Sequence, residues 1–187
     1  EFYPGEYFLY VGERGYCKNF PYVCRFISEY IKIHKQRNLI IAGGPNFTKN
    51  EKKEIKKMGL PENNIFHLKD LETKELRILY SNSLCLLIPS IYEGFGLPAL
   101  EAARCKALVL SSKGGALEEI LGPSEYAFDL SKKNDCSRVI DLGLQNDSAK
   151  TEIERTYKKS LLFSWDKAAR DYLKIYKKLL KLEKNEK

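Results

Sequence analysis

Five short, mostly apolar runs limit what this chain can fold into more than any other feature. The runs lie at Tyr7–Val11, Leu39–Ala42, Ile65–Leu68, Leu84–Ile88 and Ala107–Leu110. Their apolar character is continuous rather than alternating, which is typical of strands that are buried on both faces. Stretches with helical patterning separate the runs. This order predicts a parallel sheet covered by helices on both sides.

Capping and breaking residues mark the helices between these runs. Asn19 is suited to cap a helix that carries Pro21 in its first turn. A lysine-rich helix is predicted from about Lys49 to Met58, and a short helix is predicted to begin near Pro98, because proline fits the first turn of a helix. From Asn134 onward the pattern is helical.

Together these elements predict one Rossmann-like α/β domain of three layers over residues 1–187. Its α/β core covers about residues 1–130 and includes a last short strand at Tyr126–Phe128. A helical tail covers about residues 134–187. We find no internal repeat and no linker that would divide the chain.

Composition narrows the class of protein. The net charge is +7, but the lysines are spread over predicted helix faces, so a nucleic-acid partner is not expected. A solvated basic surface is the simplest interpretation; a phosphate-bearing ligand or peripheral contact with an anionic membrane is the alternative. No apolar run approaches the roughly 20 residues that span a bilayer. The five cysteines form no CxxC pair, which indicates reduced thiols in the cytoplasm, with the inner face of the membrane as one option.

The stretch from Pro89 to Glu101 directly follows the predicted central strand. Open α/β sheets bind ligands at this carboxyl edge. Gly94 and Gly96 allow the backbone to turn sharply and to approach a ligand closely. The amides around Gly96 and Leu97 lie at the start of a helix, where the positive end of the helix dipole favours a phosphate.

Two glutamates flank this helix start. Glu93 lies in the loop and Glu101 lies about one turn into the helix, so both side chains can face one cleft. Carboxylates are poor partners for phosphate but good acceptors for sugar hydroxyls. An ordinary glycine-proline loop with two surface glutamates is the alternative interpretation.

A second loop, Gly12–Asn19, follows the first predicted strand and carries Arg14 and Lys18. Its spacing matches neither GxGxxG nor a P-loop, so neither a dinucleotide cofactor nor a Walker site is predicted. The two cations are instead placed to neutralise a diphosphate at the Gly96 helix end. Taken alone, the loop is better interpreted as carrying two exposed basic residues.

Taken together, these residues resemble the carboxyl-terminal, donor-binding domain of GT-B-type retaining glycosyltransferases, called family 4 or group 1. The stretch Pro89–Ala103 is similar to that family's PS.yEGFGLP.lEA signature, in which two glutamates are eight residues apart. Tyr10–Phe20 resembles the family's first strand and basic loop. Phe163–Lys167 and the residues that follow it resemble the closing helix.

The resemblance implies a role for each matching residue. Lys18 and Arg14 would bind the donor's diphosphate, although many relatives carry their arginine where this chain has Glu13. Glu93 would contact the transferred sugar and Glu101 the ribose hydroxyls. Glu93, Arg14 and Lys18 are thus the expected catalytic residues. The remaining expected donor-binding positions are Gly12, Gly94, Phe95, Gly96 and Leu97.

The implied activity is retaining transfer of a sugar from a nucleoside-diphosphate sugar, UDP- or GDP-linked, to an acceptor hydroxyl. No DxD motif occurs, so no metal and no cofactor are expected. Nothing in the chain corresponds to the amino-terminal domain that would bind a glycan or lipid-linked acceptor, so the chain alone is expected to bind donor without transferring sugar. The open alternatives are a nucleotide-sugar epimerase of the same architecture and a non-catalytic nucleotide-sugar-binding partner subunit.

The last predicted helix has an apolar stripe at helical spacing from Trp165 through Tyr172 and Tyr176 to Leu180. We expect its first half to pack on the domain's own sheet. The segment after about Leu179 is expected to be exposed, toward the missing domain or an anionic membrane surface.

Overall fold

The computed structural model describes residues 5–33, 37–132, 134–145 and 148–185. The sheet found in these residues has six parallel strands in the order β3-β2-β1-β4-β5-β6. Each predicted run is found as a strand, which confirms the α/β class. The strands are β1 (Tyr7–Val11), β2 (Asn38–Ala42), β3 (Ile65–Leu68), β4 (Cys85–Ile88), β5 (Val109–Ser112) and β6 (Ala127–Phe128).

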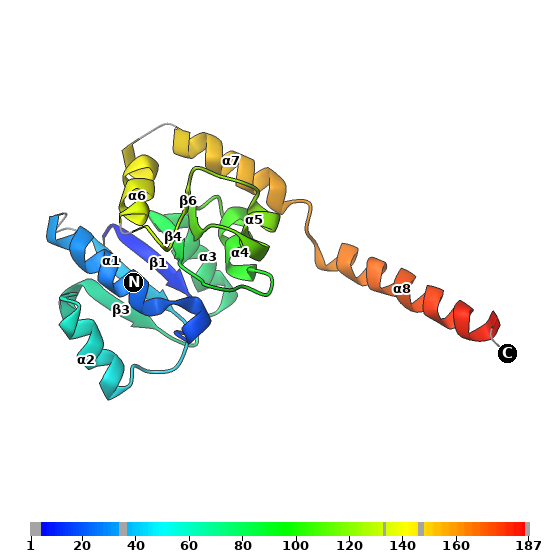
Figure 1. The fold of residues 1–187 in the computed structure, drawn as a ribbon, viewed down its shortest axis with the longest axis horizontal. Helices are drawn as coiled ribbons and strands as arrows, with labels where there is room; N and C mark the ends of the chain where they lie inside the picture. Colours follow the sequence, from blue (N-terminus) through cyan, green and yellow to red (C-terminus); the bar gives the residue numbers. More distant parts are fainter. Residues whose placement is uncertain (1–4, 34–36, 133, 146–147, 186–187) are drawn as a thin grey trace.

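Helices follow the strands as the patterning predicts, and Figure 1 shows them on both sides of the sheet. Two single turns of 3-10 helix, η1 (Tyr16–Lys18) and η2 (Glu62–Asn64), precede α1 and β3. The helices are α1 (Phe20–Ile33), α2 (Lys49–Lys57), α3 (Thr73–Asn82), α4 (Leu97–Arg104), α5 (Gly115–Leu121), α6 (Asp135–Gln145), α7 (Ser148–Ser160) and α8 (Trp165–Asn185).

The core consists of two apolar layers, one on each face of the sheet. Phe8 and Tyr10 of β1 pack in the layer that includes α1 and α6. Tyr7 and Leu9 of the same strand point to the opposite layer, which includes α4 and α5. Successive residues of a strand face opposite sides, so a strand buried on both faces must be apolar at every position. This requirement explains the continuous apolar runs in the sequence.

The fifth strand begins two residues later than the predicted run Ala107–Leu110, because helix α4 closes over the start of that run. The amide of Ala107 donates to the carbonyl oxygen of Ala102 at 3.0 Å, and Lys106 adopts a left-handed φ of 55°. The strand instead continues through Ser111 and Ser112, whose polar side chains do not signal a strand.

The helical region after Asn134 is confirmed, but it is not one uniform tail. Cys136, Val139 and Ile140 of α6 belong to the same apolar layer as α1. Helix α7 packs against α4, α5 and α6. Both helices therefore belong to the body of the domain.

Helix α8 alone extends away from the body (Figure 1). The expectation that its first half packs on the sheet is wrong: Trp165 is 80% exposed. The physical reason is that the other helices already cover both faces of the sheet, so no apolar surface is left there for α8. Further apolar residues of α8 that are more than half exposed are Tyr172, Leu173, Ile175, Tyr176, Leu179 and Leu180. Within the parts of the chain that the structure describes, no helix combines the length and apolar character needed to cross a membrane.

The strand order creates one point where the chain changes direction across the sheet. From β1 the chain proceeds outward to β2 and β3, and it then returns to place β4 on the other side of β1. The chain therefore leaves β1 and β4 in opposite directions at the carboxyl edge. In open α/β sheets, ligands bind at such a switch point.

Candidate functional site

The loops after β1 and β4 are joined directly at the switch point. The amide of Ile91 donates to the carbonyl oxygen of Cys17 at 2.8 Å. Next to this bond, the Lys18 ammonium donates to both carboxylate oxygens of Glu93, at 2.7 Å and 2.9 Å. Lys18 and Glu93, which are 75 positions apart in the chain, therefore form one ion pair at the carboxyl edge of the sheet.

The Glu93 carboxylate is held from a second side. Its side chain is 8% exposed, and its Oε1 accepts a hydrogen bond of 2.6 Å from the Ser90 hydroxyl. The carbonyl oxygen of Ser90 in turn accepts a hydrogen bond of 2.5 Å from the Ser112 hydroxyl at the end of β5. Because Ser90 and Ser112 are both buried, the carboxylate has a fixed position and orientation.

Gly96 makes the start of α4 possible. Its φ of 94° lies in the left-handed region, and a Cβ there would approach Leu117 Cδ2 to 2.9 Å and Ile120 Cδ1 to 3.1 Å. Any larger residue would collide with α5. Gly94 differs, because a Cβ there would meet no atom within 4 Å. The backbone conformation and the packing against α5 thus require glycine at Gly96, whereas no described residue requires it at Gly94.

Helix α4 carries the second predicted carboxylate. The Tyr80 hydroxyl, from α3, donates to Glu101 Oε2 at 2.9 Å. Burial, reinforced by the neighbouring Glu101 carboxylate, raises the pKa of Tyr80, so the phenol remains a hydrogen-bond donor. Glu101 is exposed on the outside of α4, so this carboxylate has both a fixed partner and access to solvent.

Arg14 is not brought to Lys18 in the structure. Its side chain is 3% exposed, and its Nε donates to Glu51 Oε1 at 2.8 Å. Its Nη2 donates to the carbonyl oxygen of Pro45 at 2.5 Å, and the guanidinium lies 4.5 Å from the centroid of the Phe47 ring. The structure therefore separates the two predicted cations: Lys18 faces the switch point, and Arg14 fastens the β1 loop to the start of α2.

The other predicted positions lie around the switch point. Gly12 ends β1 with a φ of 121°, and its amide donates to the carbonyl oxygen of Ala42 at 2.9 Å. Phe95 and Leu97 are partly exposed in the loop and at the first residue of α4. The Phe95 ring packs edge-on against Phe163, with 6.0 Å between the ring centroids, so the site loop contacts the turn before α8.

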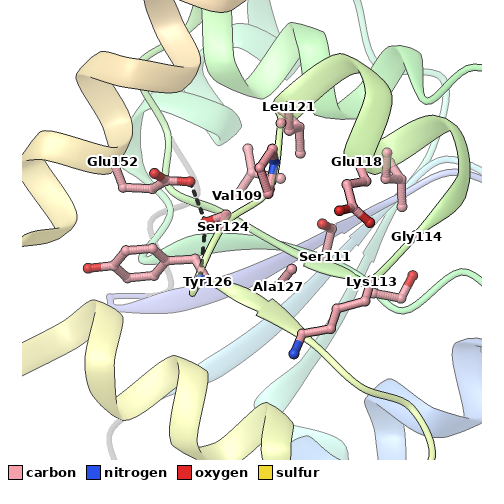
Figure 2. A pocket seen from close by; sticks show the side chains of 14 residues that line it. Val109, Ser111, Lys113, Gly114, Glu118, Leu121, Ser124, Tyr126, Ala127 and Glu152 are labelled. Carbon is pink, nitrogen blue, oxygen red and sulfur yellow. Dashed lines mark hydrogen bonds between the residues drawn. The ribbon is translucent and has the colours of Figure 1, made fainter.

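A cavity of about 270 Å³ between β5, β6, α5 and α7 is a second place to consider (Figure 2). Ser124 and Glu152 lie at one end and Lys113 and Glu118 at the other. Glu152 already accepts hydrogen bonds from Ser124 and Arg155, at 2.6 Å and 2.7 Å. The volume is below the roughly 300–1,000 Å³ of typical ligand pockets, and the cavity lies beside β5 and the edge strand β6 rather than at the switch point.

Comparison with known proteins identifies the family. Residues 4–160 match the family described as glycosyl transferases group 1. The chain belongs to this family. The resemblance deduced from the signature around Glu93 and Glu101 is thus confirmed.

This group 1 chain spans less than half the length of each of the three similar proteins described next. The chain is 31% identical over 123 residues to the serotype-specific mannosyltransferase WbdA of Escherichia coli. This match covers 65% of the chain but 15% of WbdA. The fold is similar to sucrose-phosphate synthase from Thermosynechococcus elongatus, at a TM-score of 0.79 and 21% identity, over 95% of this chain and 46% of the synthase. It is also similar to the pneumococcal O-GlcNAc transferase GtfA, solved with UDP and GlcNAc, at a TM-score of 0.76 and 16% identity, over 93% and 36%. These neighbours show a Rossmann-like half of the GT-B architecture.

Sequence reasoning missed the residues that hold the carboxylates of this group 1 chain. Ser90 stands inside the signature, but its sequence context does not show that its hydroxyl reaches Glu93. Ser112 and Tyr80 lie 22 and 21 positions from the residues they contact. Only the tertiary fold brings these pairs together, so no local sequence pattern predicts them.

Proposed function

We propose that this chain is the donor-binding half of a retaining glycosyltransferase that uses a nucleoside-diphosphate sugar. The observation that carries the proposal is the Lys18–Glu93 ion pair across the switch point, beside the start of α4. A cation, a carboxylate and a helix amino terminus suit a diphosphate joined to a sugar, because phosphate needs positive charge and sugar hydroxyls need an acceptor. Membership of a glycosyl transferase family favours transfer over the epimerase and the non-catalytic alternatives.

In this proposal the Lys18 ammonium and the amides at Gly96 and Leu97 bind the diphosphate. They stabilise the negative charge that grows on the diphosphate as its bond to the anomeric carbon breaks. Glu93 binds a hydroxyl of the transferred sugar and fixes the face from which the acceptor hydroxyl reacts. Transfer with retention means that the new bond forms on the face from which the diphosphate departs.

Glu101 binds the ribose, and Tyr80 holds its carboxylate in place. One oxygen of Glu101 accepts the Tyr80 hydrogen bond, and the carboxylate is exposed on α4. Arg14 has a different role from the one its loop suggests. We assign it to holding the β1 loop on α2 through Glu51, so that Lys18 is presented at the correct place.

We place the acceptor site outside this chain. The chain spans 36% and 46% of the two structural relatives, and α8 leaves the domain with an exposed apolar side. The chain alone is therefore proposed to bind donor and to transfer no sugar. Robust transfer to an acceptor by these 187 residues would contradict this assignment.

The test is titration calorimetry of the chain with UDP, GDP, dTDP and ADP in the presence of EDTA. UDP is the first choice because one structural relative was solved with it. At least one of the nucleoside diphosphates is expected to bind without a divalent metal. Lys18→Ala is expected to weaken binding by about 1.5–3 kcal/mol, the usual contribution of a hydrogen bond to a charged group. Binding of none of the four, or an unchanged affinity in Lys18→Ala, would refute the proposed site.

A further inference from the structure

The Lys18–Glu93 ion pair engages both of the charged side chains that the proposed function assigns to the donor. The ammonium lies 2.7 Å and 2.9 Å from the two carboxylate oxygens. Two of the three N–H groups of the ammonium are directed at Glu93, so a diphosphate that draws Lys18 toward itself competes with Glu93 for the same ammonium. The carboxylate cannot turn aside to make room, because it is buried and held by Ser90.

We propose that Glu93 makes the site discriminate between the loaded donor and the spent nucleotide. This inference rests on the proposed function. When a nucleotide sugar binds, a sugar hydroxyl replaces the ammonium as hydrogen-bond donor to Glu93, so the carboxylate stays satisfied. When the bare nucleoside diphosphate binds, nothing replaces the ammonium. The Glu93 side chain, which is 8% exposed, then lies beside the negative phosphates without the ammonium as its partner.

This discrimination favours release of the nucleotide after the sugar has been transferred. Loss of the sugar during transfer leaves Glu93 without its hydroxyl partner, and re-formation of the ion pair with Lys18 then favours release of the nucleoside diphosphate. Glu93 thus contributes to specificity twice: it attracts the sugar and it opposes the product. A residue that only stabilised the loop would show neither effect.

Ser90 is a positioning residue, because it orients the Glu93 carboxylate. Its hydroxyl holds Oε1 at 2.6 Å, and the Ser112 hydroxyl holds the Ser90 backbone at 2.5 Å. Among the contacts that the structure gives for Oε2, only Lys18 donates to this oxygen. When the diphosphate draws Lys18 away, Oε2 is therefore the atom that becomes free to accept a hydrogen bond from the sugar. Loss of the Ser90 hydroxyl is expected to weaken the sugar contact without changing the charge of the site.

The experiment compares the affinity of the chain for UDP and GDP with its affinity for the corresponding nucleotide sugars, by titration calorimetry. Glu93→Gln keeps the shape of the side chain and removes its charge. This variant is expected to bind bare nucleoside diphosphate about tenfold more tightly and to bind nucleotide sugar more weakly, so the two affinities change in opposite directions. Ser90→Ala is expected to weaken nucleotide sugar about fivefold and to leave the bare nucleotide unchanged.

Two matched controls separate this effect from general changes of charge or stability. Glu13→Gln removes an exposed negative charge from the same loop as Lys18 and is expected to leave both affinities unchanged. Ser28→Ala removes a buried hydroxyl in α1 that contacts Arg25 rather than the site. If Glu13→Gln raised the affinity for bare nucleoside diphosphate as much as Glu93→Gln does, the effect would be due to the overall charge.

The outcomes distinguish the inference from the function on which it rests. If the unaltered chain binds neither nucleotide nor nucleotide sugar, the proposed function fails and the discrimination with it. If it binds both, and Glu93→Gln leaves the bare nucleotide unchanged or weaker, only the discrimination fails. A ligand-free readout supports the same distinction: the Lys18 amine is expected to react faster with an acylating reagent in Glu93→Gln, and an unchanged rate would contradict the ion pair.

Discussion

Substitution of Gly96 by alanine tests whether the start of α4 is built as the structure shows. The φ of 94° places this residue in a region that L-residues enter at a cost of about 1–2 kcal/mol. The added Cβ would also lie 2.9 Å from Leu117 Cδ2 and 3.1 Å from Ile120 Cδ1, and such overpacking costs about 1–3 kcal/mol. Gly96→Ala is therefore expected to lower the free energy of unfolding by about 2–5 kcal/mol.

The assay is urea and thermal unfolding of Gly96→Ala beside Gly94→Ala. For a domain of this size, Tm falls by about 2–4 °C for each kcal/mol of lost stability, so Gly96→Ala is expected to melt about 4–20 °C lower. Gly94→Ala is the matched control, because a Cβ at Gly94 meets no atom within 4 Å. It is expected to change stability by less than about 1 kcal/mol. Equal stability of the two variants would refute the assigned contact between α4 and α5.

Three further predictions concern single side chains. The Tyr22 hydroxyl is buried and has no hydrogen-bond partner among the described residues, so Tyr22→Phe is expected to leave stability unchanged or to raise it by about 1 kcal/mol; a clear loss on urea unfolding would show a missed partner. Although burial acts to raise it, the pKa of Glu51 is lowered by hydrogen bonds from Arg14 and Thr48. A lowered pKa stabilises the fold above the unfolded pKa of about 4.5, and this contribution is lost as the pH falls through the folded pKa. Glu51→Gln should therefore flatten the fall of Tm below about pH 4.5. Parallel curves of Tm against pH for the variant and the unaltered chain would contradict the ion pair. Glu101→Gln should weaken the binding of nucleoside diphosphate but not that of pyrophosphate, as measured by calorimetry. Equal losses of affinity for the two ligands would show that Glu101 does not bind the ribose.

The fold was predictable from the sequence because its main determinants are local. A strand buried on both faces must be apolar at every position, so each strand of the sheet is visible as a run. The exceptions have physical reasons. Strand β5 continues into Ser111 and Ser112, and the Ser112 hydroxyl has a buried acceptor that only the fold supplies. The amphipathic pattern of α8 shows an apolar side, but not whether this domain or another partner covers it.

The candidate site was predictable only in part. Lys18 and Glu93 follow adjacent parallel strands, and the sheet topology alone places them at one edge. Arg14 occupies a similar sequence position to Lys18, yet it turns away because Glu51 and Phe47 offer it a buried partner and an aromatic face. These residues lie more than 30 positions from Arg14, so the loop sequence does not reveal the competition.

The central claim is that a nucleoside-diphosphate sugar binds at the switch point. Backbone amide chemical shifts of the ¹⁵N-labelled chain, recorded with and without UDP, GDP and their sugar conjugates, test it most directly. The largest changes are expected in the loop that contains Lys18 and in the stretch from Glu93 to Glu101. Changes concentrated instead around the cavity between β5, β6, α5 and α7 (Figure 2), at residues such as Ser124 and Glu152, would contradict the claim.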